Sequence, residues 1–192
     1  MTDTVLLTDD EIVAVCAVDG RPWPLGLMTV EPTAVEMAKA GMRGMRSLLV
    51  RRYADQGSAD APAVMDTVVA RYVAAFLDAD RRVGAYVAPS SDPVTLGGAS
   101  VTAVRSGEDW LLDSTTAAGV HALRMASADE AVEAILGLVD KAEQDELFAE
   151  AEDPARWICV AALNSALHVV AGDGVTASRV RQEILGEPVL QS

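Results

Sequence analysis

The spacing of hydrophobic positions along this 192-residue chain changes near residue 83. Before that point apolar residues recur every three or four positions, which is typical of one face of a helix. From Val83 to Met125 they tend to alternate with polar residues, which is typical of strands with one buried face. The pattern predicts an α+β fold with N-terminal helices, an antiparallel β meander packed by helices, and a C-terminal helical segment.

Cap signals indicate where the predicted helices begin. Thr8, Thr33 and Ser127 each stand three residues before a glutamate, which is the arrangement of a capping box. A short strand is expected at 5–7. Helices are then expected at 9–18, at 34–53, at 61–77 and from Ser127 onward. Between the third and fourth helices, strand signals at 83–87, 101–104, 110–112 and 120–125 predict the meander, with a polar loop over 89–98.

The C-terminal part of the chain is predicted to be helical. Asp153 and Pro154 are cap and first-turn residues for a long helix that ends near Gly172, and a final helix is expected at 177–185. The domain organisation predicted from this is an α+β segment at 1–143 and a helical segment at 144–192, packed together as one globular unit. The long helix is apolar on several sides, so it either lies between the α+β segment and the final helix, which we favour, or completes a homodimer.

The second helix carries an apolar stripe that contains methionines. Its members follow one another at helical spacing and end at an arginine: Ala38, Met42, Met45, Leu49 and Arg52. Such a stripe either packs in the core or forms an adaptable binding surface, and we favour core packing. Gly41 and Gly44 on the same helix are small enough to allow close packing of a neighbouring helix.

The net charge of −14, from 15 basic and 29 acidic residues, argues against a nucleic-acid or anionic membrane partner. No apolar stretch is long enough to span a membrane, and the acidic start does not resemble a signal peptide, so we expect a cytoplasmic protein. Cys16 and Cys159 are interpreted as small core residues. A winged-helix DNA-binding domain remains an alternative, with recognition residues Arg43, Arg46, Arg51 and Arg52.

Motifs that carry chemistry are not recognisable in the sequence. His121 and His168 are the only histidines, and neither belongs to a spacing that gathers metal ligands, so no metal and no cofactor are expected. We interpret His121 as a sheet-surface or core residue. Signatures of an activated nucleophile or of a phosphate-binding loop are also absent from the sequence. The alternative is an enzyme that assembles a small-molecule pocket from distant carboxylates or from His121.

The order of features between residues 5 and 142 resembles one α/β half of the EspG family, the cytosolic chaperones of mycobacterial type VII secretion. The resemblance is carried by four segments: 7–11 opening a helix, 46–51 within the second helix, 101–105 through 110–112 in the meander, and the capped helix from Ser127. It implies a sheet packed by helices, and a function in binding PE/PPE substrate pairs without covalent chemistry.

The leading hypothesis is therefore a protein-binding adaptor or secretion chaperone. Its predicted contact surface is the meander around Trp110, Leu112 and Leu123, together with the 89–98 loop, because strand faces and adjoining loops can accept a partner segment.

Overall fold

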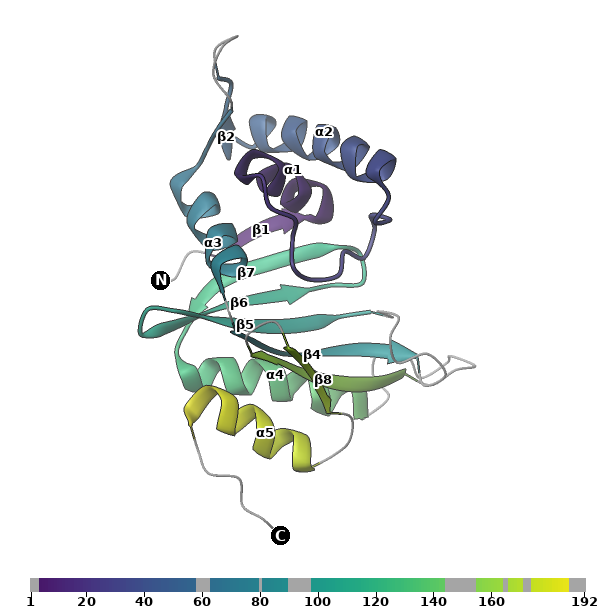
Figure 1. Ribbon diagram of the computed structural model, residues 1–192, viewed down its shortest axis with the longest axis vertical. Helices are drawn as coiled ribbons and strands as arrows, with labels where there is room; N and C mark the ends of the chain where they lie inside the picture. The colour runs from purple at the N-terminus through teal and green to yellow at the C-terminus, as the bar shows by residue number, and fades with distance from the viewer. Residues whose placement is uncertain are drawn as a thin grey trace.

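Seven antiparallel strands form one sheet in the described part of the computed structural model, in the order β1-β7-β6-β5-β4-β8-β9 (Figure 1). The structure describes residues 4–57, 63–79, 81–89, 98–143, 155–163, 166–170 and 174–186. The strands of the sheet are β1 Val5–Thr8, β4 Arg81–Pro89, β5 Ser100–Ser106, β6 Asp109–Thr115, β7 Val120–Ala126, β8 Ala155–Leu163 and β9 Ala166–Val170. The α+β class predicted from the sequence is confirmed.

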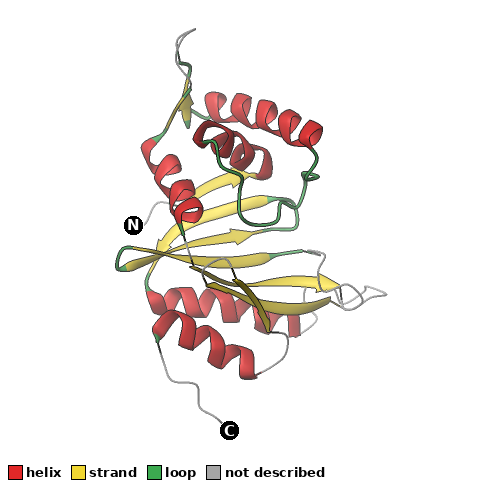
Figure 2. Cartoon of the chain, viewed as in Figure 1, coloured by secondary structure: helices red, strands yellow, loops and turns green. Residues whose placement is uncertain are grey.

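Helices cover both faces of the sheet, at opposite ends (Figures 1 and 2). The helices are α1 Asp9–Asp19, α2 Ala34–Val50, α3 Thr67–Asp78, α4 Ala128–Glu143 and α5 Gly174–Leu185. The first three lie over the β1 end, and α4 with α5 lies against the other face. Strand β6 shows how alternation divides the core: Leu111 packs with α1 and α3, whereas Trp110 and Leu112 pack with α4 and α5.

The predicted cap signals form in the structure. Thr8 and Glu11 make a reciprocal capping box at α1, and Ser127 and Glu130 make another at α4. The Thr33 hydroxyl accepts a hydrogen bond from the backbone nitrogen of Glu36 at α2. The third helix starts later than expected, because Asp66 caps α3 and Val64 belongs to a small hairpin of β2 Ala54–Asp55 and β3 Val64–Met65.

The predicted long helix over 154–172 is wrong. The described residues of that range form β8 at 155–163 and β9 at 166–170, and β8 pairs with β4 along its whole length, from Arg81 opposite Leu163 to Pro89 opposite Ala155. A continuous apolar run does not by itself distinguish a buried helix from an interior strand. The β-branched and aromatic residues of the run, among them Trp157, Ile158 and Val160, favour the strand. A homodimer was an alternative only because this helix would have been apolar on several sides, so the strands remove the reason to expect one.

Residues from both sides of position 143 therefore contribute to one sheet. The division of the chain into segments 1–143 and 144–192 stays a prediction. Helix α5, which follows β9, agrees with the final helix expected at 177–185.

Helices α1 and α2 are in close contact at Gly44. A Cβ atom added there would lie 1.9 Å from the carbonyl oxygen of Asp10, so an alanine forces the two backbones apart. We expect Gly44→Ala to lower the free energy of unfolding by about 1 to 3 kcal/mol. Gly41→Ala is the matched control, because its Cβ would lie 3.7 Å from Val13 Cγ1. It should be neutral or stabilising by up to about 1 kcal/mol.

Urea denaturation of the two variants measures this difference. Equal stability of Gly44→Ala and Gly41→Ala would contradict the close approach of α1 and α2, because both variants gain the same helix propensity.

Candidate protein-binding surface

The residues predicted to contact a partner lie in the core of the chain. Trp110 is 5% exposed, and Leu112 and Leu123 are fully buried. The first two pack under α4 and α5, and Leu123 packs under the N-terminal helices. Most of the loop over 89–98 falls outside the described residues. A contact surface at these three side chains stays a prediction, and their burial does not support it. A partner would contact exposed residues instead.

His121 lies at the centre of a buried polar cluster that the sequence did not reveal. Its Nε2 atom is 2.8 Å from Asp9 Oδ1, and its Nδ1 atom is 2.8 Å from Asp113 Oδ2 and 3.1 Å from Thr115 Oγ1. Asp9 also accepts hydrogen bonds from the backbone nitrogen and the hydroxyl of Thr29, at 2.6 and 2.8 Å. The cluster joins the start of α1 and the segment before α2 to strands β6 and β7.

The two carboxylates keep His121 charged. Burial disfavours the imidazolium and by itself lowers the pKa of His121. The hydrogen bonds to Asp113 and Asp9, together with the negative charges of these carboxylates, outweigh burial and raise the pKa to about 9. Burial also acts to raise the pKa of Asp9, and the hydrogen bonds from His121 and Thr29 lower it below its usual value. Because all three ionisable side chains are almost completely buried, the cluster is sealed from a substrate in solution.

A third buried carboxylate, Glu11, connects α1 to α2. It accepts hydrogen bonds from the Ser47 hydroxyl at 2.6 Å and from Arg51 Nη1 at 2.6 and 2.8 Å. On the surface beside it, Arg43 makes two hydrogen bonds to Asp10. Two of the four arginines proposed for DNA recognition are thus engaged within the fold. The sequence had indicated Glu11 only as a capping residue.

Helix α2 leaves several of its apolar residues exposed to the solvent. Its buried positions are Ala40, Gly44 and Leu48, spaced four residues apart. The opposite side, here called the outer face of α2, consists of Val35, Ala38, Met42, Met45 and Leu49. Val35 is 63% exposed and Met42 59%. The core-packing interpretation of the methionine stripe is therefore wrong at Ala38 and Met42, whereas Met45 and Leu49 are half-buried.

The orientation of α2 follows from the close packing of α1 against it. The small residues Ala40 and Gly44 let the two helix backbones approach, which a face of methionines and leucines would prevent. Glu11 and Asp10 on α1 then hold Arg51 and Arg43 on α2. These contacts direct Ala40 and Gly44 inward and leave Val35, Ala38 and Met42 uncovered in the described part of the chain. Met45 and Leu49 pack at the edge of the N-terminal core.

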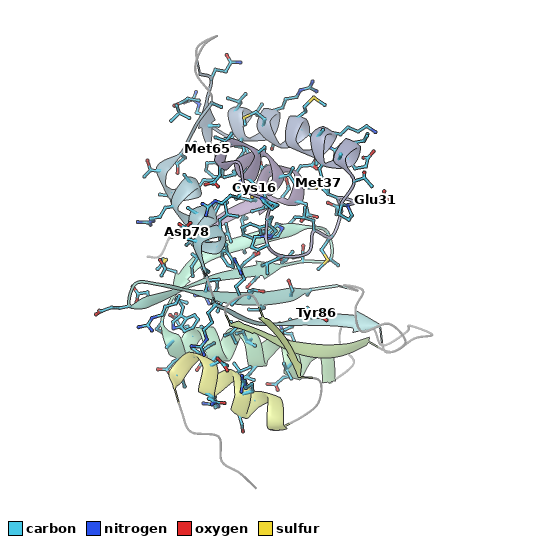
Figure 3. The ribbon with its side chains drawn as sticks, in the orientation of Figure 1. Cys16, Glu31, Met37, Met65, Asp78 and Tyr86 are labelled. Atoms are coloured by element: carbon cyan, nitrogen blue, oxygen red, sulfur yellow. The ribbon has the colours of Figure 1, made fainter. Side chains whose placement is uncertain are left out.

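A pocket of about 370 Å³ lies at one edge of the outer face. Met37 and Ala38 of α2 form one wall, and the rest of the lining comes from α1 and the segment after it: Val13, Cys16, Ala17, Gly20, Arg21, Pro22 and Trp23. Figure 3 labels Cys16 and Met37, which both line it. The Trp23 ring also packs on Phe76 and meets the His121 ring edge-on, at centroid distances of 5.1 and 6.0 Å. The lining is predominantly apolar.

Basic residues line the other edge of the outer face. Lys39 is 2.7 Å from Glu36, and Arg43 pairs with Asp10. Arg46, which is exposed, has no ion-pair partner among the described residues. The outer face is therefore bordered by an apolar pocket on one side and by cations on the other, in a chain with a net charge of −14.

The described residues contain no cluster of three or more His, Cys, Asp or Glu side chains arranged to hold a metal ion. Each of their helices is too short or too polar to cross a lipid bilayer.

Comparison with known proteins gives a structural likeness and no sequence match. No protein-family model matches the sequence, and no curated protein matches it. Among solved structures, the chain is similar to the Mycobacterium tuberculosis type VII secretion system chaperone EspG5, solved in complex with a PE25-PPE41 dimer. The two share 10% identity with a TM-score of 0.48, over 87% of this chain and 80% of EspG5. Because a likeness of this size does not transfer a binding site, any function has to be argued from this chain's own surface.

Proposed function

We propose that this chain is a protein-binding module, an adaptor or chaperone that performs no covalent chemistry. The observation that carries the proposal is the outer face of α2, where Val35 and Met42 are mostly exposed although the chain has a well-filled core. Clustered exposed apolar residues mark interaction sites, and methionine suits such sites because its flexible thioether adapts to different partners.

The buried polar groups support binding over catalysis. The ionisable side chains that converge on His121 are sealed in the core, whereas the pocket beside α2 is apolar. Its one thiol, Cys16, is a poor nucleophile. Burial and then the negative charge of Asp19 raise its pKa to about 12, against an opposing effect of Arg21, so the thiolate is scarce at neutral pH.

The finer form of the proposal is a cytoplasmic secretion chaperone with a PE/PPE pair as its partner. The sequence resemblance to the EspG family implies this partner. Co-expression of the tagged chain with PE/PPE pairs, followed by size-exclusion chromatography, tests it directly. A stable complex with one such pair supports the finer proposal. If none of the tested pairs forms a complex, a PE/PPE pair is not the partner, and the binding surface is tested separately.

Substitution of the outer face tests the binding surface. We expect the double variant Val35→Ser, Met42→Ser to fold like the wild type, because both side chains are mostly exposed. We expect its affinity for a captured protein partner to fall at least about tenfold, since central apolar contacts dominate most interfaces. Quantitative pull-down with the two chains at matched concentrations measures the loss.

Val64→Ser is the matched control, because Val64 is 64% exposed and lies on β3, outside the outer face. It should bind like the wild type. A partner that binds the double variant and the control equally well would place the contact elsewhere on the molecule.

A further inference from the structure

We infer that the partner segment is an amphipathic helix that lies along the outer face of α2, with carboxylates on the side that meets Lys39 and Arg46. This inference rests on the proposed function and specifies the chemistry of the partner.

The spacing of the residues on the outer face matches that of one helix in a coiled coil. Val35, Met42 and Leu49 recur every seven residues, and Ala38 and Met45 fall between them. Val35, Ala38 and Met42 are exposed, and Met45 and Leu49 are half-buried against the N-terminal core. Apolar positions that alternate steps of three and four form the seam against which a second helix packs. An extended strand would instead need an open sheet edge with free backbone groups, which a helix face does not offer.

The two borders of the seam select the orientation and charge of the incoming helix. On the pocket border, Met37 and Ala38 offer space for a bulky apolar side chain. On the other border, Lys39 and Arg46 occupy successive positions beside the seam, and these are the positions that pair with charges on a partner helix. Glutamate or aspartate on the facing side of the partner complements these cations.

The overall acidity of the chain does not oppose this arrangement at short range. At physiological ionic strength charges are screened beyond about 8 Å, so the cations beside the seam outweigh the distant carboxylates. Arg46 contributes most, because Lys39 and Arg43 already have the acidic neighbours Glu36 and Asp10.

A second copy of this chain fits the surface less well. In a two-fold antiparallel pair of α2 helices, the Lys39 and Arg46 side chains of the two copies would face one another across the seam. Like charges in these positions disfavour the pair.

Methionine methyl NMR on the full chain tests the inference. The sequence has seven methionines, of which Met37 reports on the pocket, Met42 and Met45 on the seam, and Met65 and Met125 on other parts of the fold. The probes are two synthetic helical peptides of three heptads with leucine along the seam, one with glutamate and one with lysine at the flanking positions. Like flanking charges keep each peptide from pairing with itself. A glutamate peptide of the same composition in scrambled order is the control.

The glutamate peptide is expected to shift the Met37, Met42 and Met45 signals saturably and to leave Met65 and Met125 unchanged. The lysine peptide should bind at least about fivefold more weakly, and the scrambled peptide should not bind. Arg46→Glu should reverse the preference for glutamate over lysine. Arg105→Glu, which changes an exposed arginine on β5, should not.

Each contrary result has its own meaning. Equal binding of the glutamate and lysine peptides overturns the acidic-helix inference, as does a preference that Arg46→Glu leaves intact. If neither peptide shifts the three signals, the helical mode is wrong, although the outer face still binds protein if the double serine variant loses its partner. Concentration-dependent light scattering together with a lack of peptide binding would assign the face to a second copy. The outer face fails independently as the contact surface, when the double serine variant keeps its partner.

Discussion

Replacing His121 with leucine should destabilise the chain by about 3 to 5 kcal/mol at pH 7, the range for removing one member of a buried ion pair. His121 is 2.8 Å from a carboxylate oxygen of both Asp9 and Asp113, and all three side chains are almost completely buried. Leucine fills much of the space of the imidazole but leaves two buried carboxylates without a cation. Urea denaturation at pH 7 measures the change in the free energy of unfolding.

The double variant His121→Leu, Asp113→Leu separates charge from packing. It removes one of the stranded carboxylates, so it should be more stable than His121→Leu alone even though it carries an additional substitution. If His121→Leu lowers the free energy of unfolding by less than about 1 kcal/mol, the charge interactions within the cluster contribute little to stability. A double variant less stable than the single one would attribute the effect to packing.

The stability of the wild-type chain should fall as the pH rises from about 6.5 to about 9. The pKa of His121 is raised from 6.5 in the unfolded chain to about 9 in the fold, so the folded state binds more protons in this interval. The contribution is complete below pH 6.5 and is lost as the pH rises through 9. Its size corresponds to roughly 3 kcal/mol.

Urea denaturation at several pH values between 6 and 10 measures this dependence. The His121→Leu variant is the reference, because it lacks the titrating group and should show a much flatter profile in the same interval. In the opposite direction, the lowered pKa of Asp9 adds stability above pH 3.8 that is lost as the pH falls further. Parallel profiles for the wild type and the variant would show that His121 does not take up a proton on folding.

Local sequence signals determined much of the fold. The three hydroxyl-to-glutamate signals begin α1, α2 and α4, because a side chain can satisfy the free backbone donors of the first turn within three residues. The alternation from Val83 onward predicts the meander of β4 to β7, since the period of two depends only on the backbone of a strand. These features need no information about distant residues.

The tertiary structure alone decided the identity of the 155–170 segment and the roles of the buried charges. An apolar run that is central to a sheet looks like a buried helix until a neighbouring strand is known, and β4, which pairs with β8, lies about seventy residues earlier. Asp9 and Asp113 are 104 positions apart, and only the pairing of β1 with β7 and of β7 with β6 brings both to His121. The apolar stripe of α2 was visible in the sequence, but its direction was not. Periodicity identifies the residues that share a face, whereas the choice between core and solvent depended on the close approach of α1 at Gly44.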